Sequence, residues 1–468
     1  MANTTIYPFG SAGVLSSAVS IDTLIKFYHH FRINGSDWIT GGIDAATGEI
    51  TENGYITPAL PLLNGKGIMI SYTPIEGFDF VCWAYNSDGT PAGAITPVDG
   101  SVQSVSLSTP TGWMRAALIA QAGYSYNLSG NELDRAELNV YLPKERTGSY
   151  FRNPVILQDL PDPSIWDGED GYHYLIGTNL SKNLNDITLY RSRNLTDWED
   201  TGRPPFTPAT VAQLQAADVL NGNVFWAADV KKIRPGVWNM YLCKPTNGTW
   251  GGIAVLTSSH PTFGFEFVRF MTPDREEFID PWVEYDFDGK LWMFLGAAGI
   301  YRREMNADGT DFADGSSWVH VAGLSRTASN NPGLQKTFEG ACLYYRKGYW
   351  YLFVSAGNWT TDNYKVKVSR SASLTGSFVD RSGNPATDGS SEEVISTLDG
   401  YFWGPGHHAP ILADEDNKTW MVFHSHCVAL NDTGKRAPCL TEIVWDADGW
   451  PSAKYKHPML VGEGTSMF

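Results

Sequence analysis

Alternating apolar and polar positions recur along most of this chain and predict short β-strands. From about residue 154 onward the alternation becomes a repeat, in which a turn opens a strand of aromatic and aliphatic residues. A short segment that ends in a turn precedes each of these strands, and another strand-like run follows it. The aromatic strand occurs as GYHYLIGT (171–178), GVWNMYLCK (236–244), GKLWMFLGA (289–297), GYWYLFVSA (348–356) and NKTWMVFHS (417–425).

The spacing of this repeat indicates the fold. Residues 162–468 divide into five units of about 61 residues, enough for a four-stranded propeller blade of ~40–50 residues with its loops. We therefore predict an all-β chain in which residues 154–468 form a five-bladed β-propeller. Two stacked sandwiches are a weaker alternative, because they give no reason for a fivefold repeat.

The chain before the repeat is organised differently. Residues 1–35 are expected to be an N-terminal extension in which IDTLIKFYHHFRI (21–33) forms an amphipathic helix. Alternating runs separated by turn signals over 36–142 predict a small antiparallel β-sandwich, followed by a linker at 143–153. Glycan binding and assembly into oligomers both stay open as roles for the sandwich. Its candidate sugar platforms are Trp83, Tyr85 and Trp113.

Charge and composition narrow the range of partners. The net charge of −17 argues against nucleic acid and anionic membranes, whose phosphates would repel the protein. No run approaches ~18 consecutive apolar residues, so no membrane-spanning helix is expected. The first residues lack the features of a signal peptide, although an extracellular, periplasmic or virion-associated location is favoured. Five scattered cysteines without a CxxC pair are expected to be buried free thiols.

Three acidic residues occupy the same position of three repeats. Asp162, Asp280 and Glu339 each lie nine residues before the turn glycine that opens the aromatic strand. The first strand of each propeller blade lines the central channel, so equal register predicts that these acids converge at one mouth of that channel. Asp229 lies seven residues before its turn glycine and His407 ten residues before Asn417, so both are expected nearby.

Such a cluster suits acid–base chemistry on a glycosidic bond. Like charges raise the pKa of at least one carboxyl group, which then holds its proton near neutral pH. Inverting glycoside hydrolysis uses one carboxylate to activate water and one carboxylic acid to protonate the leaving oxygen. Ion pairing within the strands and a calcium site built from the same oxygens are the alternatives.

The segments that carry these acids resemble glycoside hydrolase family 43, the five-bladed propeller glycosidases. The resemblance covers about 153–455 and rests on NPVILQDLPDPSI, FIDPWVEYDFDGKLW and FEGACLYYRKGYWYLFVS, with WAADV and GPGHH as further landmarks. It implies that Asp162 is the general base, Glu339 the general acid and Asp280 the residue that modulates the pKa and orientation of that acid. No cofactor is implied to be necessary.

The resemblance also implies residues that contact the substrate. His407 matches a histidine that reaches a channel calcium ion or the sugar, and Arg436 matches an arginine that contacts sugar hydroxyls. Trp226 is the candidate stacking platform, and Asp229 and Trp282 are further candidates, with Trp282 standing where the family usually has histidine. The later motifs favour arabinan-acting members that cleave α-L-arabinofuranosidic bonds. A β-xylosidase, a galactofuranosidase, and a non-catalytic glycan-binding propeller or phage adhesin remain alternatives.

Overall fold

The computed structural model contains two compact units. One comprises the chain up to Arg152 with Asp399–Tyr401 and Met459–Gly464, and the other comprises most of Asn153–Pro458. The structure describes residues 28–33, 38–47, 49–62, 68–73, 75, 78–86, 89–95, 103–105, 112–121, 137–143, 150–180, 182–217, 222–245, 252–271, 278–324, 338–398, 400–430 and 434–463.

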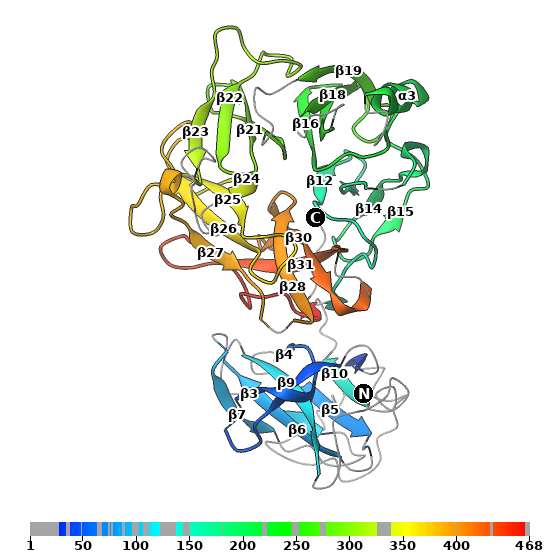
Figure 1. Cartoon of the computed structure of the whole chain (residues 1–468), viewed down its shortest axis with the longest axis vertical. Coiled ribbons are helices and arrows are strands. Elements are labelled where there is room, and N and C mark those ends of the chain that lie inside the picture. Colours follow the sequence, from blue (N-terminus) through cyan, green and yellow to red (C-terminus); the bar gives the residue numbers. More distant parts are fainter. Residues whose placement is uncertain are drawn as a thin grey trace, which may run out of the picture. The chain divides into compact units, whose positions relative to one another are not determined.

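The larger unit is built from five antiparallel sheets that follow one another along the chain and surround a centre (Figure 1). The first three sheets are β12(Ser164–Asp167)–β13(His173–Ile176)–β14(Tyr190–Ser192)–β15(Glu199–Asp200), β16(Ala228–Arg234)–β17(Val237–Cys243)–β18(Ile253–Ser258)–β19(Glu266–Met271) and β20(Trp282–Tyr285)–β21(Leu291–Leu295)–β22(Ile300–Glu304)–β23(Val319–Ala322). The last two are β24(Phe338–Arg346)–β25(Tyr349–Ala356)–β26(Lys365–Ser371)–β27(Glu392–Ile395) and β28(Phe402–His408)–β30(Thr419–Cys427)–β31(Ala437–Trp445)–β32(Pro451–Ala453), with β29(Leu412–Ala413) beside β30.

The sequence repeat corresponds to these sheets. In all five, the predicted aromatic segment forms the second strand, so the five-bladed propeller is confirmed. The residue that opens each aromatic segment has a left-handed backbone, with φ between 60° and 89°. These residues are Gly171, Gly236, Gly289, Gly348 and Asn417. Glycine and asparagine tolerate this conformation better than other residues, which explains why the turn recurs with this chemistry.

The second strands hold neighbouring blades together. In β17, Met240 and Leu242 belong to one buried cluster, whereas Tyr241 and Cys243 belong to the next. Successive side chains of a strand point to opposite faces, so one strand contributes to two adjacent cores. Most aromatic residues of the repeat are therefore structural, and the site chemistry depends on few side chains.

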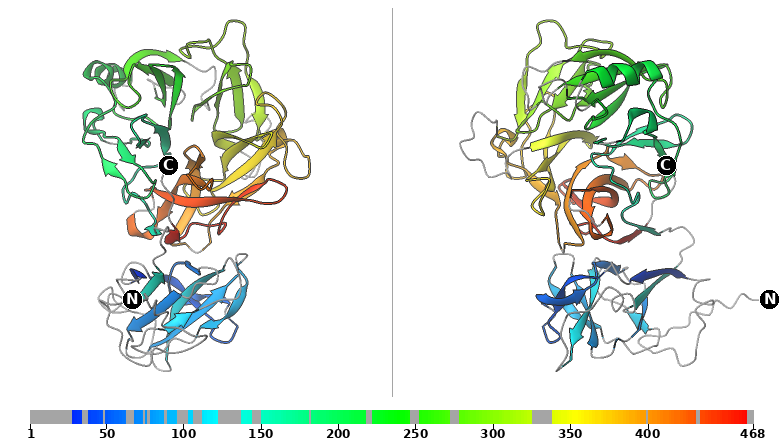
Figure 2. Two further views of the ribbon diagram at one scale, coloured as in Figure 1. Left: turned by 180° about the vertical axis from the view of Figure 1, so that it is seen from behind. Right: turned by 45° about the vertical axis from the view of Figure 1, so that its right-hand side comes forward.

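The N-terminal unit contains two antiparallel sheets (Figure 2). One has the order β1(Tyr28–Ile33)–β10(Glu137–Pro143)–β5(Ile68–Thr73)–β8(Gln103–Val105). The other is β2(Ile39–Ile43)–β3(Ile50–Ile56)–β9(Gly112–Ala120)–β6(Phe78–Tyr85)–β7(Pro91–Ile95), with β4(Leu60–Leu62) beside β9. Tyr72 of the first sheet stacks on Phe80 of the second at 4.4 Å between ring centroids. A short pair, β11(Tyr150–Arg152) and β33(Val461–Glu463), also belongs to this unit.

Two sequence predictions for this unit are wrong. Residues 28–33 form strand β1 rather than the end of a helix, because pairing with β10 along six residues outweighs the weak local helical pattern. The remainder of the predicted helix, 21–27, lies outside the described residues. Tyr85 and Trp113 are completely buried and stack on each other at 4.3 Å, so they pack the core and cannot be sugar platforms.

Helices contribute little to the described part of the chain. They are α3(Pro208–Ala216) and the 3-10 turns η2(Leu184–Asp186), η5(Ala386–Asp388) and η6(Val428–Leu430). None of the helices in the described ranges has the length and apolar character needed to cross a membrane. All five cysteines are buried free thiols, as predicted.

Candidate active site

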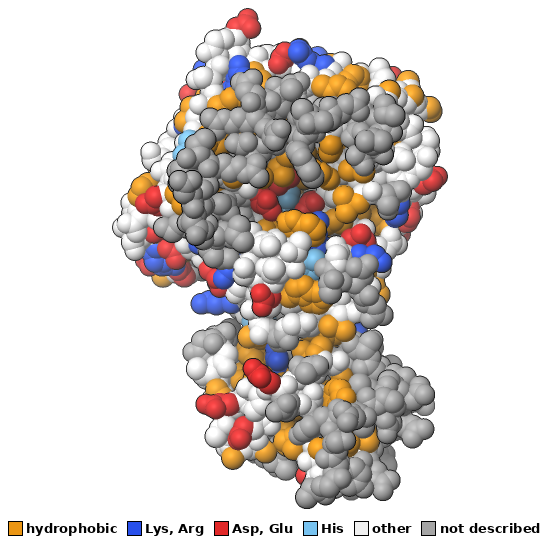
Figure 3. All heavy atoms as spheres, viewed as in Figure 1, with side chains coloured by type: hydrophobic (Ala, Val, Ile, Leu, Met, Phe, Trp, Pro, Cys, Tyr) orange, Lys and Arg blue, Asp and Glu red, His pale blue; other side chains and the backbone are white. Residues whose placement is uncertain are grey.

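The three register-matched acids lie at corresponding ends of channel-lining strands. Asp162 and Asp280 each precede the first residue of their strand by two positions, and Glu339 is the second residue of β24. Both aspartates have a left-handed backbone, with φ of 54° and 57°, although neither is glycine. The shared conformation places the two carboxylates equivalently in their blades. In Figure 3, acidic and histidine side chains lie in a hollow near the middle of the propeller face.

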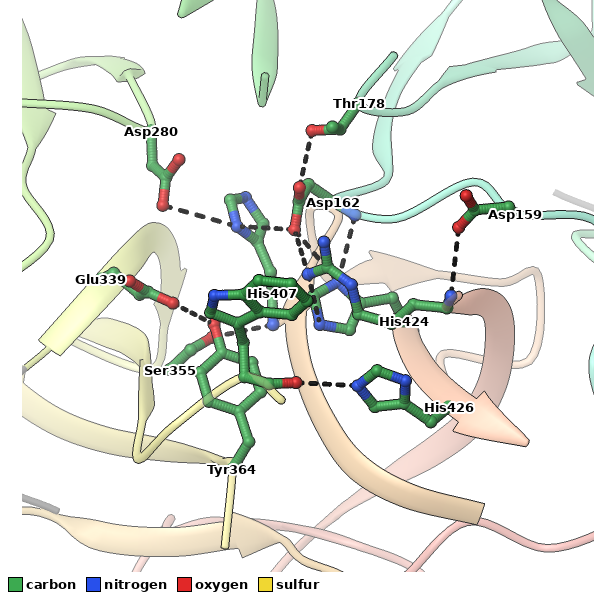
Figure 4. Close-up of polar contacts among 12 residues, drawn as sticks. Asp159, Asp162, Thr178, Asp280, Glu339, Ser355, Tyr364, His407, His424 and His426 are labelled. Atoms are coloured by element: carbon green, nitrogen blue, oxygen red, sulfur yellow. Dashed lines mark hydrogen bonds and ion pairs between the residues drawn. The ribbon is translucent and has the colours of Figure 1, made fainter. Parts of the chain in front are cut away.

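Asp162 is surrounded by donors and positive charge (Figure 4). Its Oδ2 accepts a 2.6 Å hydrogen bond from Thr178, and Arg436 lies 3.3 Å from Oδ1. Its backbone N–H donates to Nδ1 of the buried His424 at 3.1 Å. Burial favours the neutral acid, but the charge of Arg436 and the nearby His407 and His424 outweigh it, so the pKa of Asp162 lies well below its usual range. This carboxylate is ionised at every physiological pH.

Glu339 has the opposite environment. Its only described hydrogen-bond partner outside the backbone is the hydroxyl of Tyr364, which donates to Oε1 at 2.5 Å. Burial raises the pKa of Glu339 to about 7, with the charge of Asp162 adding to the shift and the Tyr364 hydrogen bond opposing it. Burial and repulsion from Glu339 and Asp162 raise the pKa of Asp280 well above its usual range. The cluster therefore combines one ionised carboxylate with carboxyl groups that hold protons near neutral pH.

His407 connects the acids. Its Nδ1 lies 3.4 Å from Oδ1 of Asp162 and 3.6 Å from Oδ2 of Asp280. Its backbone N–H donates to the hydroxyl of Ser355 at 2.7 Å. Burial lowers the pKa of His407, so the ring is neutral in the working range of the site. A Cβ atom on Gly340, whose φ is 60°, would lie 3.1 Å from Nδ1 of His407, so this glycine leaves room for the ring.

Arg436 is held from several sides. Its backbone N–H donates to Asp159, and its guanidinium lies over the ring of Trp359 at 4.5 Å. Trp359 is 40% exposed, and its carbonyl oxygen lies 2.7 Å from Nε2 of His426. An arginine fixed in this way presents a rigid set of donors beside the acid cluster.

The structure brings together some predicted residues and separates others. Asp162, Asp280, Glu339, His407 and Arg436 form one cluster. Asp229 and Trp282 instead line a different pocket, described below. Trp226 is half-buried and packs against the core shared by the second and third blades. The roles predicted for these last three residues in substrate binding stay predictions.

Several residues of the site escaped the sequence analysis. They are Thr178, Ser355, Trp359, Tyr364 and His424. One signal was available for His424, because the polar HSH stretch (424–426) interrupts a strand whose other residues are mostly apolar. Tyr364 stands in no motif that would separate it from the many structural tyrosines.

A calcium ion was predicted at His407. Within the ranges that the structure describes, no group of three or more histidine, cysteine, aspartate or glutamate side chains is arranged to hold a metal ion. The calcium site therefore stays a prediction, and no step proposed below passes through a metal.

Comparison with known proteins agrees with this geometry. Residues 151–451 match the family described as glycosyl hydrolases family 43. The chain is 26% identical to the extracellular exo-α-(1→5)-L-arabinofuranosidase ArbA of Cellvibrio japonicus, over 64% of this chain and 87% of that protein. It is 23% identical to the extracellular endo-α-(1→5)-L-arabinanase 2 of Bacillus subtilis, over 66% of this chain and 73% of that protein.

A solved structure shares the fold. The α-L-arabinanase of Cellvibrio cellulosa complexed with arabinohexaose aligns with a TM-score of 0.53 and 23% identity, over 63% of this chain and 95% of the other. The register of the acids, their separated proton affinities and the match over most of the propeller lead to one conclusion. This chain belongs to family 43 of the glycosyl hydrolases.

Proposed function

We propose that this glycoside hydrolase cleaves α-L-arabinofuranosidic bonds by an inverting mechanism. The observation that carries the proposal is the contrast between two carboxyl groups in one cluster. Asp162 has a pKa well below its usual range, whereas the pKa of Glu339 is about 7. One group is thus ready to accept a proton and the other to donate one, as acid–base cleavage of a glycosidic bond requires. The inverting course is the one that the resemblance to family 43 implies.

In this mechanism Asp162 removes a proton from water as the water attacks the anomeric carbon. Glu339 delivers its proton to the glycosidic oxygen, so that the departing sugar leaves as a neutral alcohol. Burial and the charge of Asp162 keep Glu339 protonated, and Asp280 takes the role of orienting this acid that the family resemblance implies. The neutral His407 spaces Asp280 from Asp162. Arg436 holds Asp162 ionised, and in this mechanism its remaining N–H groups donate to a sugar hydroxyl.

The names of the two bacterial relatives support the choice of sugar and the place of action. The two bacterial proteins act on α-(1→5)-L-arabinan or its arabinofuranosyl units, and both are called extracellular. We therefore propose arabinan as the substrate and a place of action outside the cell. Oligomerisation through the N-terminal unit stays a prediction.

Substrates with different leaving groups distinguish the roles of the two acids. Glu339→Gln should lower the turnover of linear arabinan by about 10²–10⁴-fold, because the departing alkoxide is then unprotonated. The same variant should keep most of its activity on a dinitrophenyl glycoside of arabinose or arabinobiose, whose phenolate leaves without a proton. Asp162→Asn should lose both activities, because water must be activated in either case.

Glu199→Gln is the matched control, because Glu199 is 60% exposed and pairs with Arg191 on the outer strand of the first blade. Proton NMR of the first-formed anomer tests inversion. Equal losses on both substrates in Glu339→Gln would contradict its role as the acid, and a retained anomer would contradict the mechanism.

A further inference from the structure

A second pocket, of about 320 Å³, lies on the channel-lining strands of the propeller. Its walls come from β16, β20, β24 and the start of β25, and from the segment that follows β28. Along β24, Glu339 is the second residue and Tyr345 the eighth, which corresponds to about 20 Å of extended strand. On β24 the pocket is therefore lined by residues far along the strand from Glu339, whereas on β16 and β20 it begins at Asp229 and Trp282, near the start of each strand.

Two aromatic rings line this pocket, and the ring of Phe287 lies against both of them. Tyr345 and Trp350 line it, and their ring centroids are 5.2 Å apart. Phe287, in the turn between β20 and β21, lies 4.8 Å from Tyr345 and 5.5 Å from Trp350. Phe287 is 71% exposed and Tyr345 42% exposed. Apolar rings this exposed are unusual outside binding sites when they are grouped.

Polar groups form the other side of the pocket. Asp229, Lys231 and Glu284 line it, and Nζ of Lys231 lies 2.5 Å from Oε1 of Glu284. Oδ2 of Asp229 accepts a 2.7 Å hydrogen bond from the backbone N–H of Val283. Because the lysine and the glutamate already neutralise each other, the pocket favours a neutral ligand with hydroxyl groups over a free ion.

We propose that this pocket is a second carbohydrate-binding site. It holds one sugar residue of a polysaccharide while another part of the same polysaccharide is cleaved at the acid cluster. Aromatic rings present flat apolar faces to the C–H groups of a sugar ring, and charged side chains bind its hydroxyl groups. The site increases the affinity of the propeller for polymeric substrate, whereas short substrates bind at the acid cluster alone. Arabinan as its ligand rests on the proposed function.

The test compares polymer with small substrate in the full chain. Phe287→Leu removes the exposed ring, and Phe287→Tyr keeps it. Affinity electrophoresis in gels that contain linear arabinan should give a dissociation constant about three- to tenfold higher for Phe287→Leu, and a wild-type value for Phe287→Tyr. The KM for arabinan should rise by a similar factor in Phe287→Leu, while kcat/KM on the dinitrophenyl glycoside reports the active site separately.

Val268→Ala is the control, because Val268 is also exposed but lies on β19, at the outer edge of the second blade. Unchanged arabinan binding in Phe287→Leu would overturn the proposal, and so would an equal loss on the dinitrophenyl glycoside. If the wild-type chain cleaved neither arabinan nor the glycoside, the proposed function itself would fail, which is a different result.

Discussion

The two ends of the propeller channel use similar side chains for different purposes. At one end Glu339 is half-buried beside a hydroxyl group, and desolvation keeps its proton in place up to about pH 7. At the other end Glu284 lies beside the ammonium group of Lys231 and forms an ion pair. A desolvated carboxyl group keeps its proton near neutral pH, and can act as an acid catalyst, when no full positive charge lies directly beside it.

The position of the cation separates the two ends further. Arg436 lies against Asp162 and lowers the pKa of that carboxyl group, whereas Glu339 keeps a raised pKa. The two acids can therefore act as base and acid at the same pH. Lys231 lies directly against Glu284 and forms an ion pair with it, away from the acid cluster.

Substitution of Arg436 and of Lys231 should give the largest difference in activity between the two ends. Arg436→Met should lower kcat/KM on arabinan by about 10²-fold, because Asp162 loses the charge that keeps it ionised. The pKa of Asp162 should rise, so the acidic limb of the pH–rate profile should move to higher pH. Lys231→Met is the matched variant at the other end, and its acidic limb should stay where it is. Identical profiles for both variants would contradict the assigned difference.

Filling the space beside His407 should have the second-largest effect on activity. Gly340→Ala should lower kcat by about tenfold, because a Cβ atom 3.1 Å from Nδ1 displaces the ring that spaces Asp162 from Asp280. Gly315→Ala is the control, since Gly315 also has a positive φ, of 73°, but nothing within 4 Å of the added atom. Both variants should lose a similar ~1 kcal/mol of stability in thermal unfolding, but kcat should fall in Gly340→Ala alone.

The hydroxyl beside Glu339 should have a smaller effect that appears in the pH profile. The hydrogen bond from Tyr364 lowers the pKa of Glu339, so Tyr364→Phe should raise it. The acid is active only while protonated, and the alkaline limb of kcat/KM should therefore move from about pH 7 to higher pH. Tyr345→Phe, at the other end of β24, should leave this limb unchanged. A shift of the Tyr364→Phe limb to lower pH would contradict the assigned hydrogen bond.

The smallest effect should be on stability at the far end. Burial raises the pKa of Asp229 to about 7, against the lowering effect of Lys231. The folded state thus binds a proton more tightly than the unfolded state, and this contribution to stability is lost as the pH rises through 7. Asp229→Asn should therefore unfold about 2–4 °C above the wild type at pH 8 and close to it at pH 4. An equal difference at both pH values would contradict the titration of Asp229.

Much of the fold was predictable because its signal is local and repeated. A left-handed turn, an aromatic strand and a fixed register are each written into a few adjacent residues, and five copies reinforce one another. The same register predicts that Asp162, Asp280 and Glu339 lie at one end of the channel. The helix predicted over residues 28–33 is wrong for the converse reason, because the strand that forms there depends on pairing with β10, more than one hundred residues away.

The sequence by itself determined the propeller, the register of the three acids and the family to which the motifs belong. Only the tertiary structure decided which acid is ionised, because Arg436, His424 and Tyr364 reach the cluster from other strands and loops. It alone also separated Asp229 and Trp282 from the acids and placed them with Phe287, Tyr345 and Trp350. Proton affinity and pocket membership depend on contacts between blades, and a pattern within one repeat does not contain those contacts.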